Sequence, residues 1–179
     1  PGYSGPLFLE ISPRTFPVRV RRGSRLSQMR FRVGDTRLSI EEHRALHEAQ
    51  TLVLDPNEPV GEGVSLSIDL KGDGRGGLIG FRSKRHTNVI DMDIKDTLDV
   101  LDYWEPLINR GSDEFILDPD EFYILVSRES VHVPPAYAAE MVPFDPMVGE
   151  FRVHYAGFFD PGFGHSGSGG TGRLAVLEV

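Results

Sequence analysis

The chain has 179 residues, of which 39% are hydrophobic and 26% are charged, and this composition is typical of a soluble globular protein. A net charge of −8 argues against bulk binding to nucleic acid, and no apolar run approaches the roughly 20 residues that a membrane helix needs. Because there is no cysteine, disulfides, thiol nucleophiles and thiolate metal sites are excluded, and we expect a reducing, cytoplasmic location.

The first 35 residues have the pattern of a compact β unit. Short apolar runs at 7–11, 18–20 and 26–31 are separated by proline and glycine, which favours strands joined by tight turns. The period then changes, because Ser39 and Glu42 form a capping box ahead of apolar residues at helical spacing. We therefore predict a linker helix in this part of the chain.

Strand signals return after the linker. Two apolar runs flank the glycine-rich stretch 71–77, which predicts a hairpin between 65–70 and 78–81. Further strands are expected at 121–127, 130–135, 151–159 and 173–179. Between them, apolar residues at helical spacing predict one inserted helix over 94–109. The second part of the chain is therefore expected to be mostly β, with a single helix inserted.

One phrase stands at both ends of the chain: Pro-Gly, an aromatic residue, small residues, an apolar run and then Leu-Glu. The separation of the two copies is that of a domain and is much longer than a solenoid repeat. We therefore interpret the chain as a fragment of a tandem repeat. Residues 1–35 are the C-terminal part of the first unit, 36–51 are the linker helix, and 52–179 are most of the second unit.

Glu10 and Glu178 end the apolar run in the two copies of this phrase. A lone strand glutamate is more often a solvated residue, because an unpaired buried carboxylate is costly. Its repetition after a glycine-containing turn shifts the interpretation toward function. A carboxylate in a partly dry site can take a proton from water, so both residues are candidates for a general base. Asp160 opens an Asp-Pro-Gly turn and, taken alone, is better explained as a turn residue.

Three other groups of polar residues have simpler explanations than a ligand site. His43 and His47 share one face of the predicted linker helix, but a solvated face is the better explanation, and we predict no metal site. The stretch 71–77 lacks the spacing of a phosphate-binding P-loop. The basic residues at 82–86 are enough to meet a phosphate, although charged strand ends are common.

A series of segments follows the motif order of one enzyme family. In the second unit these segments are SIDLKG (67–72), HTNVID (86–91), PDEFYILVSRESVHVPP (119–135), GEFRVHYAGFFDPGF (149–163) and LAVLEV (174–179). In the first unit, PGYSGPLFLEI and RRGSRLSQMRF are similar to the last of these strands and the one after it. Together they resemble the dUTPase-like trimeric nucleotide enzymes and, within them, the dCTP deaminases. Each motif is moderately specific, but their order makes the set strong.

The resemblance implies an all-β fold of β-clip (dUTPase-like) units. It implies hydrolytic deamination of deoxycytidine triphosphate to dUTP and ammonia, without metal-bound water and with the triphosphate held as its Mg²⁺ complex. It also implies a homo-oligomer with trimer-like or pseudo-trimer packing. The family's catalytic glutamate falls on Glu10 and, in the second copy, on Glu178. Its nucleotide-binding positions fall on the backbone of Phe8, Leu9, Val176 and Leu177, on the base-pocket residues Ala156 and Gly157, and on the sugar-side Asp160.

The stretch 141–149 departs from the family pattern. The family binds the triphosphate here with arginine and serine, whereas MVPFDPMVG contains neither. A site built from the second copy alone should therefore bind triphosphate poorly. We expect Glu10 to serve the working site and Glu178 to be a relic, unless cations at 82–85 replace this clamp. Because sites in this family lie between subunits, a tandem chain could also combine groups from both copies.

Two alternative functions stay open. A dUTP diphosphatase shares the fold, but glycine in the turn at position 162 and glutamate at position 10 favour deamination over attack at phosphorus. A bifunctional deaminase and diphosphatase would combine the same two features. The missing clamp is also compatible with a non-catalytic nucleotide-binding or assembly module.

Overall fold

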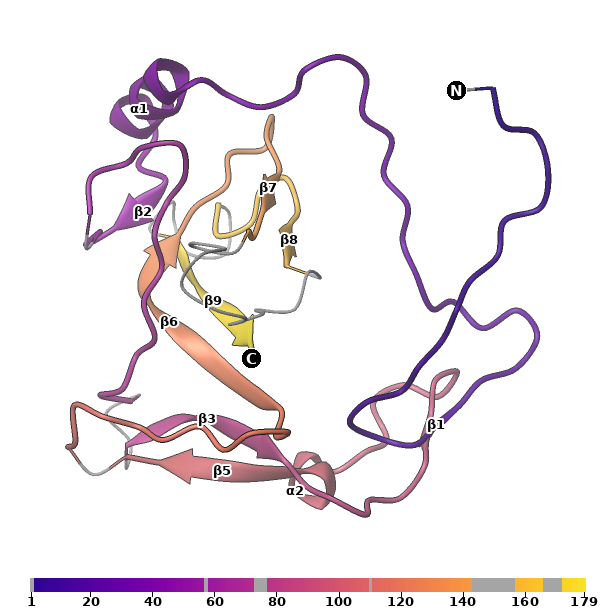
Figure 1. The fold of residues 1–179 in the computed structure, drawn as a ribbon. Helices are drawn as coiled ribbons and strands as arrows, with labels where there is room; N and C mark the ends of the chain where they lie inside the picture. The colour runs from indigo at the N-terminus through magenta and orange to yellow at the C-terminus, as the bar shows by residue number, and fades with distance from the viewer. Residues whose placement is uncertain (1, 57, 73–76, 110, 143–156, 166–171) are drawn as a thin grey trace.

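The computed structural model describes the chain except for residues 1, 57, 73–76, 110, 143–156 and 166–171. The described part is rich in strands, with two short helices (Figure 1). In chain order the elements are β1 (Val18–Arg19), α1 (Ile40–Ala49), β2 (Val53–Leu54), β3 (Leu78–Ser83), β4 (Ile90–Asp91), α2 (Val100–Tyr103), β5 (Trp104–Ile108), β6 (Tyr123–Val131), β7 (Ala139–Glu140), β8 (Phe158–Phe159) and β9 (Arg173–Glu178). The β-rich fold expected from the sequence is confirmed, whereas the tandem repeat and the domain bounds stay predictions. Neither described helix is long and apolar enough to cross a membrane.

Strand β6 is the centre of the largest sheet. β3 and β2 pair with successive parts of β6, β5 extends the sheet beyond β3, and β9 lies antiparallel along β6. Side chains of β6 alternate between buried and more exposed positions, as expected for a strand with one face in the core. The two strands expected at 121–127 and 130–135 are thus joined into one continuous strand.

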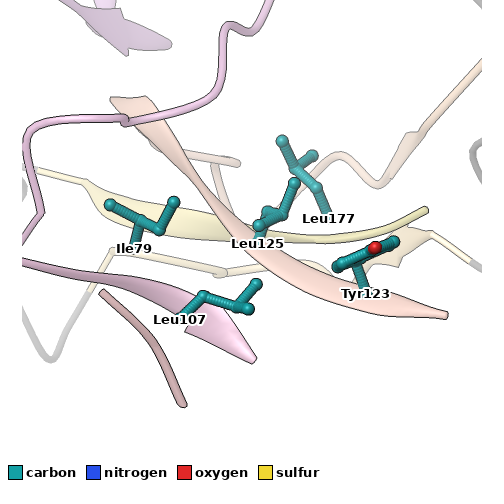
Figure 2. Close-up of a cluster of buried hydrophobic side chains, with 5 residues drawn as sticks. All are labelled: Ile79, Leu107, Tyr123, Leu125 and Leu177. Carbon is teal, nitrogen blue, oxygen red and sulfur yellow. The ribbon is translucent and has the colours of Figure 1, made fainter. Parts of the chain in front are cut away.

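The apolar core lies between β3, β5, β6 and β9. Figure 2 shows the side chains of its larger cluster: Ile79, Leu107, Tyr123, Leu125 and Leu177. A second cluster continues it toward the end of β6, with the buried residues Val131, Val133 and Ala175. Burying one large apolar side chain contributes about 1.5–3 kcal/mol, so these contacts add to the antiparallel ladder that holds β9 against β6.

Helix α1 confirms the helix and the capping box predicted after Ser39, whereas its role as a linker stays a prediction. The Ser39 side chain accepts a hydrogen bond from the Glu42 N–H at 3.3 Å, and the Glu42 carboxylate accepts one from the Ser39 N–H at 2.8 Å. The bond from the Ser39 backbone lowers the pKa of Glu42 below its usual value. The motif therefore fixes the start of the helix, as its sequence indicates.

The predicted helix over 94–109 is wrong. Only the four residues of α2 are helical, and the residues after them form β5, which pairs with β3. The residues that suggested a helix share no buried face, because Ile94, Leu98 and Leu101 are each about half exposed. Pro106 is compatible with a strand here because β5 pairs with β3 alone in the described sheet, and proline occurs in such edge strands.

The predicted hairpin around 71–77 is also wrong. β3 has β5 on one side and β6 on the other, so no edge of β3 is left for 65–70. That segment instead lies against β6, where Ile68 bridges to Ser127. The glycine-rich stretch therefore connects two segments that pair with the same central strand, and not with each other.

The first 35 residues run as an extended arm that leaves the sheet (Figure 1). The strands expected at 7–11 and 26–31 do not form, and within the described arm only β1 is a strand, paired in parallel with β4. Phe8, Phe31 and Val33 are about nine-tenths exposed. The arm is therefore ordered by contacts with the rest of the chain and not by a core of its own.

Two contacts fasten the middle of this arm. The Phe16 ring meets Tyr103 and Trp104 edge to face, at centroid distances of 5.7 and 5.2 Å. The Arg21 guanidinium donates to both carboxylate oxygens of Asp91 at 2.6 Å, and to Asp93 at 3.0 Å. We call this second contact the Arg21 clasp. It joins the arm to β4 and the loop after it.

Candidate functional site

Glu178 lies at the end of β9, on the side of the strand that faces away from the core. Ala175 and Leu177 are buried, whereas Val176 is 59% exposed and Glu178 is partly exposed. Glu178 stands opposite Ile124 of β6. The carboxylate therefore sits beside apolar side chains and within reach of water, as a general base requires. Because the Leu177 side chain is in the core, any contact of Leu177 with a nucleotide can involve only its backbone.

Asp160 begins a turn directly after β8. The turn closes through a hydrogen bond of 3.0 Å from the Phe163 N–H to the Asp160 carbonyl, with Gly162 in the left-handed region at φ +86°. Two further backbone bonds join Gly162 and Phe163 to Val133, just beyond the end of β6. The Asp160 side chain, which is 77% exposed, therefore projects from a turn that is held by the sheet.

The Asp160 turn and β9 pack on the same apolar cluster. Phe159 and Phe163 meet edge to face at 4.9 Å, and both pack against the buried cluster that contains Ala175 of β9. The Asp160 turn therefore packs near the start of β9, whereas Glu178 lies at the other end of the strand and on its opposite face. Gly157, before β8, accepts a 2.7 Å hydrogen bond from the Met141 N–H. Ala156, the other predicted base-pocket residue, lies outside the described residues.

Glu10 lies elsewhere, in the N-terminal arm. It lines a shallow hollow of about 400 Å³ formed by residues of the arm between Leu9 and Leu26, together with Met92. The neighbouring Phe8 and Leu9 are 90% and 59% exposed. The described lining contains no residue of β9, so the structure does not bring Glu10 and Glu178 into one site. They belong to two separate candidate sites.

Arg30 is a residue at the Asp160 turn that sequence reasoning missed. Its Nη2 donates to Asp160 Oδ1 at 2.5 Å, and its guanidinium lies 4.4 Å from the centre of the Phe158 ring. Two positions further on, Arg32 donates to Glu140 of β7 at 2.7 Å. The arm is thereby docked on the β7–β8 pair. In the sequence, Arg30 and Arg32 are spaced as on one face of a strand. Their partners are more than a hundred residues away, so the contacts could not be predicted from the sequence.

The basic residues proposed to meet a phosphate are already engaged within the second unit. Arg82 donates to Glu105 at 2.7 Å, and this hydrogen bond raises the pKa of Arg82 above its usual value. Arg85 donates to Glu121 at 2.6 Å, and the Lys84 ammonium donates to a backbone carbonyl of α2. These cations therefore stabilise local structure, which weakens the case for them as a replacement clamp.

Histidine side chains also serve the fold in this structure. On α1, His43 Nδ1 lies 3.0 Å from the Gly61 carbonyl, and His47 Nδ1 accepts from the Leu52 N–H at 3.2 Å. Sequence reasoning missed a second pair, in which His132 Nε2 lies 2.9 Å from Nδ1 of the stacked ring of His165. This pair joins β2–β6 to the end of the Asp160 turn. It could not be predicted from the sequence because the two histidines are 33 residues apart.

Two family models match the chain. Residues 39–179 match the C-terminal domain of 2′-deoxycytidine 5′-triphosphate deaminase, and residues 1–35 match its N-terminal domain. No protein with a curated description matches the chain. Among solved structures, the crystal structure of 2′-deoxycytidine 5′-triphosphate deaminase from Agrobacterium tumefaciens is 69% identical, with a TM-score of 0.90 over 99% of this chain. The chain spans 53% of that protein's length. The chain belongs to the 2′-deoxycytidine 5′-triphosphate deaminase family.

Proposed function

We propose that this protein deaminates dCTP to dUTP and ammonia by hydrolysis. The observation that carries the proposal is the 69% identity, over 99% of the chain, to a protein described as a dCTP deaminase. The two family models, which cover residues 1–35 and 39–179, support the same activity. The glutamates at the ends of the two repeated apolar runs supply the acid–base group that such a reaction needs.

In the proposed reaction a glutamate carboxylate removes a proton from water, and the water oxygen attacks C4 of the cytosine ring. The same glutamate then delivers the proton to the amino group, the C–N bond breaks, and ammonia leaves. The C4 hydroxyl loses its hydrogen and N3 gains one, so the C4 oxygen becomes the carbonyl of uracil. One water is consumed for each ammonia released. Glu10 and Glu178 are the two candidates for this base, each in its own site.

The remaining groups are proposed to hold the nucleotide in place. Asp160 accepts a hydrogen bond from the deoxyribose, Ala156 and Gly157 border the base, and the backbone before each glutamate lies along the nucleotide at Phe8–Leu9 and Val176–Leu177. The triphosphate enters as its Mg²⁺ complex, so the phosphate oxygens and water supply the metal ligands. We further propose homo-oligomeric packing of the trimer or pseudo-trimer type, and a cytoplasmic location.

Incubation of the purified protein with dCTP and Mg²⁺, followed by measurement of ammonia and of the nucleotide products, tests this function. We expect one ammonia for each dUTP formed, and no pyrophosphate. Release of pyrophosphate from dUTP would indicate the diphosphatase or bifunctional alternative. Binding of dCTP without any product, measured by isothermal titration calorimetry, would support the alternative of a non-catalytic nucleotide-binding module.

A further inference from the structure

The contact between Arg30 and Asp160 joins the N-terminal arm to a candidate site of the second unit. Arg30 donates to Oδ1 of Asp160 at 2.5 Å. The guanidinium also lies 4.4 Å from the centre of the Phe158 ring, and only 26% of the Arg30 side chain is exposed. A guanidinium that both stacks and forms a charge-assisted hydrogen bond is held in one orientation. Arg30 is therefore well placed to orient the Asp160 carboxylate.

Arg32 provides a second, separate contact of the same arm. Its side chain is paired with Glu140 on β7, and both side chains are close to half exposed. An exposed pair of this kind contributes little to stability. Arg30 and Arg32 thus dock the same stretch of chain, but only Arg30 contacts a predicted nucleotide-binding residue. Arg32 is therefore a matched reference for Arg30.

Charge gives Arg30 a second role at this turn. An isolated Asp160 carboxylate would repel an incoming triphosphate, and 141–149 supplies no cation to offset the repulsion. Arg30 neutralises Asp160 through one carboxylate oxygen. Among the described residues, the other oxygen has no hydrogen-bond partner, so it is open to a ligand. A deoxyribose attached through its 5′ oxygen offers one free hydroxyl, at C3′, as a donor.

We infer that Arg30 is a substrate-positioning residue for nucleotide binding at Asp160, supplied by the N-terminal arm to the site of the second unit. The guanidinium fixes and neutralises the carboxylate, and the free carboxylate oxygen accepts the hydrogen bond from the sugar hydroxyl. This inference rests on the proposed function, because it takes a deoxynucleotide as the ligand. It adds a residue from a different part of the chain to that site.

The test compares nucleotide affinity in Arg30→Gln, Arg30→Lys and Arg32→Gln by isothermal titration calorimetry with the full chain. The ligands are dCTP and its 2′,3′-dideoxy analogue, which lacks the hydroxyl that Asp160 would accept from. We expect Arg30→Gln to weaken dCTP binding about tenfold, or about 1.4 kcal/mol, and to weaken binding of the dideoxy analogue much less. Lysine restores the charge but not the planar fork, so Arg30→Lys should lie between the two. Arg32→Gln should stay within about twofold of the unmodified protein.

The outcomes separate this inference from the proposed function. Equal losses of dCTP affinity in Arg30→Gln and Arg32→Gln would show that Arg30 only docks the arm. Equal losses of affinity for dCTP and for the dideoxy analogue would show that Arg30 does not act through the sugar hydroxyl. Either result overturns the inference. Urea unfolding of each variant shows whether a loss of dCTP affinity is due to misfolding. If Arg30→Gln is misfolded, the dCTP affinity of Arg30→Lys is compared with that of Arg32→Gln instead. If the Arg30 pattern is found but no ammonia is released from dCTP, the inference stands and the deaminase function fails. If the unmodified protein binds no nucleotide, both fail.

Discussion

Glu129 is a fully buried carboxylate in the middle of β6, and its partners explain why it is tolerated there. Its two oxygens accept from the Ser67 N–H at 2.8 Å and from the Ser67 hydroxyl at 2.6 Å. Burial opposes ionisation, but the bonds from Ser67 outweigh it and lower the pKa of Glu129 below its usual value. The next buried residue, Ser127, donates to the Glu129 carbonyl and accepts from the Ala175 N–H of β9. This polar network therefore links 65–70, β6 and β9.

Glu129→Gln should lower the free energy of unfolding by about 1–3 kcal/mol, because an amide NH₂ would face one of the two Ser67 donors and leave it unsatisfied. Urea unfolding followed by circular dichroism measures the change. Glu140→Gln is the matched control: Glu140 is 40% exposed and pairs with Arg32 at the surface, so its loss should cost less than about 1 kcal/mol. Equal losses in the two variants would contradict the role given to the buried network.

Helices and strands were predicted correctly where residues close in sequence also determine the local structure. The capping box at Ser39 and the β9 strand both formed as predicted, because a cap needs only its own turn and β9 alternates over a buried face. The 94–109 stretch failed because pairing with β3 overrode its helical spacing. The 7–11 and 26–31 runs failed because a strand needs a partner, and none is offered by the described residues.

The candidate site was predictable to the same extent. Glu10 and Glu178 could be singled out because they end a phrase that is repeated in consecutive residues, and Asp160 because its segment resembles that of the family. Arg30 could not, since its role depends on a contact with a residue 130 positions away. A close approach between distant segments leaves no mark in either local sequence. This is why the structure adds most where the arm meets the second unit.

The Arg21 clasp gives a prediction about acid pH. The hydrogen bond from Arg21 lowers the pKa of Asp91 to about 2, from an ordinary value of 3.8. Because the folded pKa is depressed, the clasp contributes fully above about pH 4 and loses its contribution as the pH falls toward 2. Asp91→Asn should therefore loosen the arm at pH 7, and its difference from the unmodified protein should shrink as the pH falls through about 2.

Fluorescence of Trp104 can follow this change, because it is the single tryptophan and it contacts Phe16 of the arm. Asp113→Asn removes a charge from an exposed position and serves as the control, with no expected effect on the signal at pH 7. A difference between Asp91→Asn and the unmodified protein that persists unchanged at pH 2 would show that the Arg21 clasp does not control docking of the arm.

At the scale of the whole molecule, the chain presents two candidate bases in unlike surroundings. Glu178 stands at the end of β9, on a sheet with a buried apolar core, while Arg30 joins the arm to the Asp160 turn, which packs near the start of β9. Glu10 stands on an arm whose apolar side chains are largely exposed, and its hollow is open to solvent. The clamp expected at 141–149 is missing from the sequence for the Glu178 site. Nucleotide binding at Asp160 and the choice of the glutamate that acts as the base therefore need separate experiments.

The question of chemistry is decided by comparing Glu10→Gln with Glu178→Gln. Glutamine keeps the shape and most hydrogen bonds of glutamate but cannot take a proton from water, so the loss should fall on kcat and leave dCTP affinity within about tenfold. We expect Glu10→Gln to lower ammonia release by about 100-fold or more, since a positioned general base contributes typically 10²–10⁴-fold. Glu178→Gln should retain most of the activity, because its site lacks the phosphate-binding arginines. If Glu178→Gln alone stops deamination, the base is Glu178, and the Arg30 contact then serves the working site.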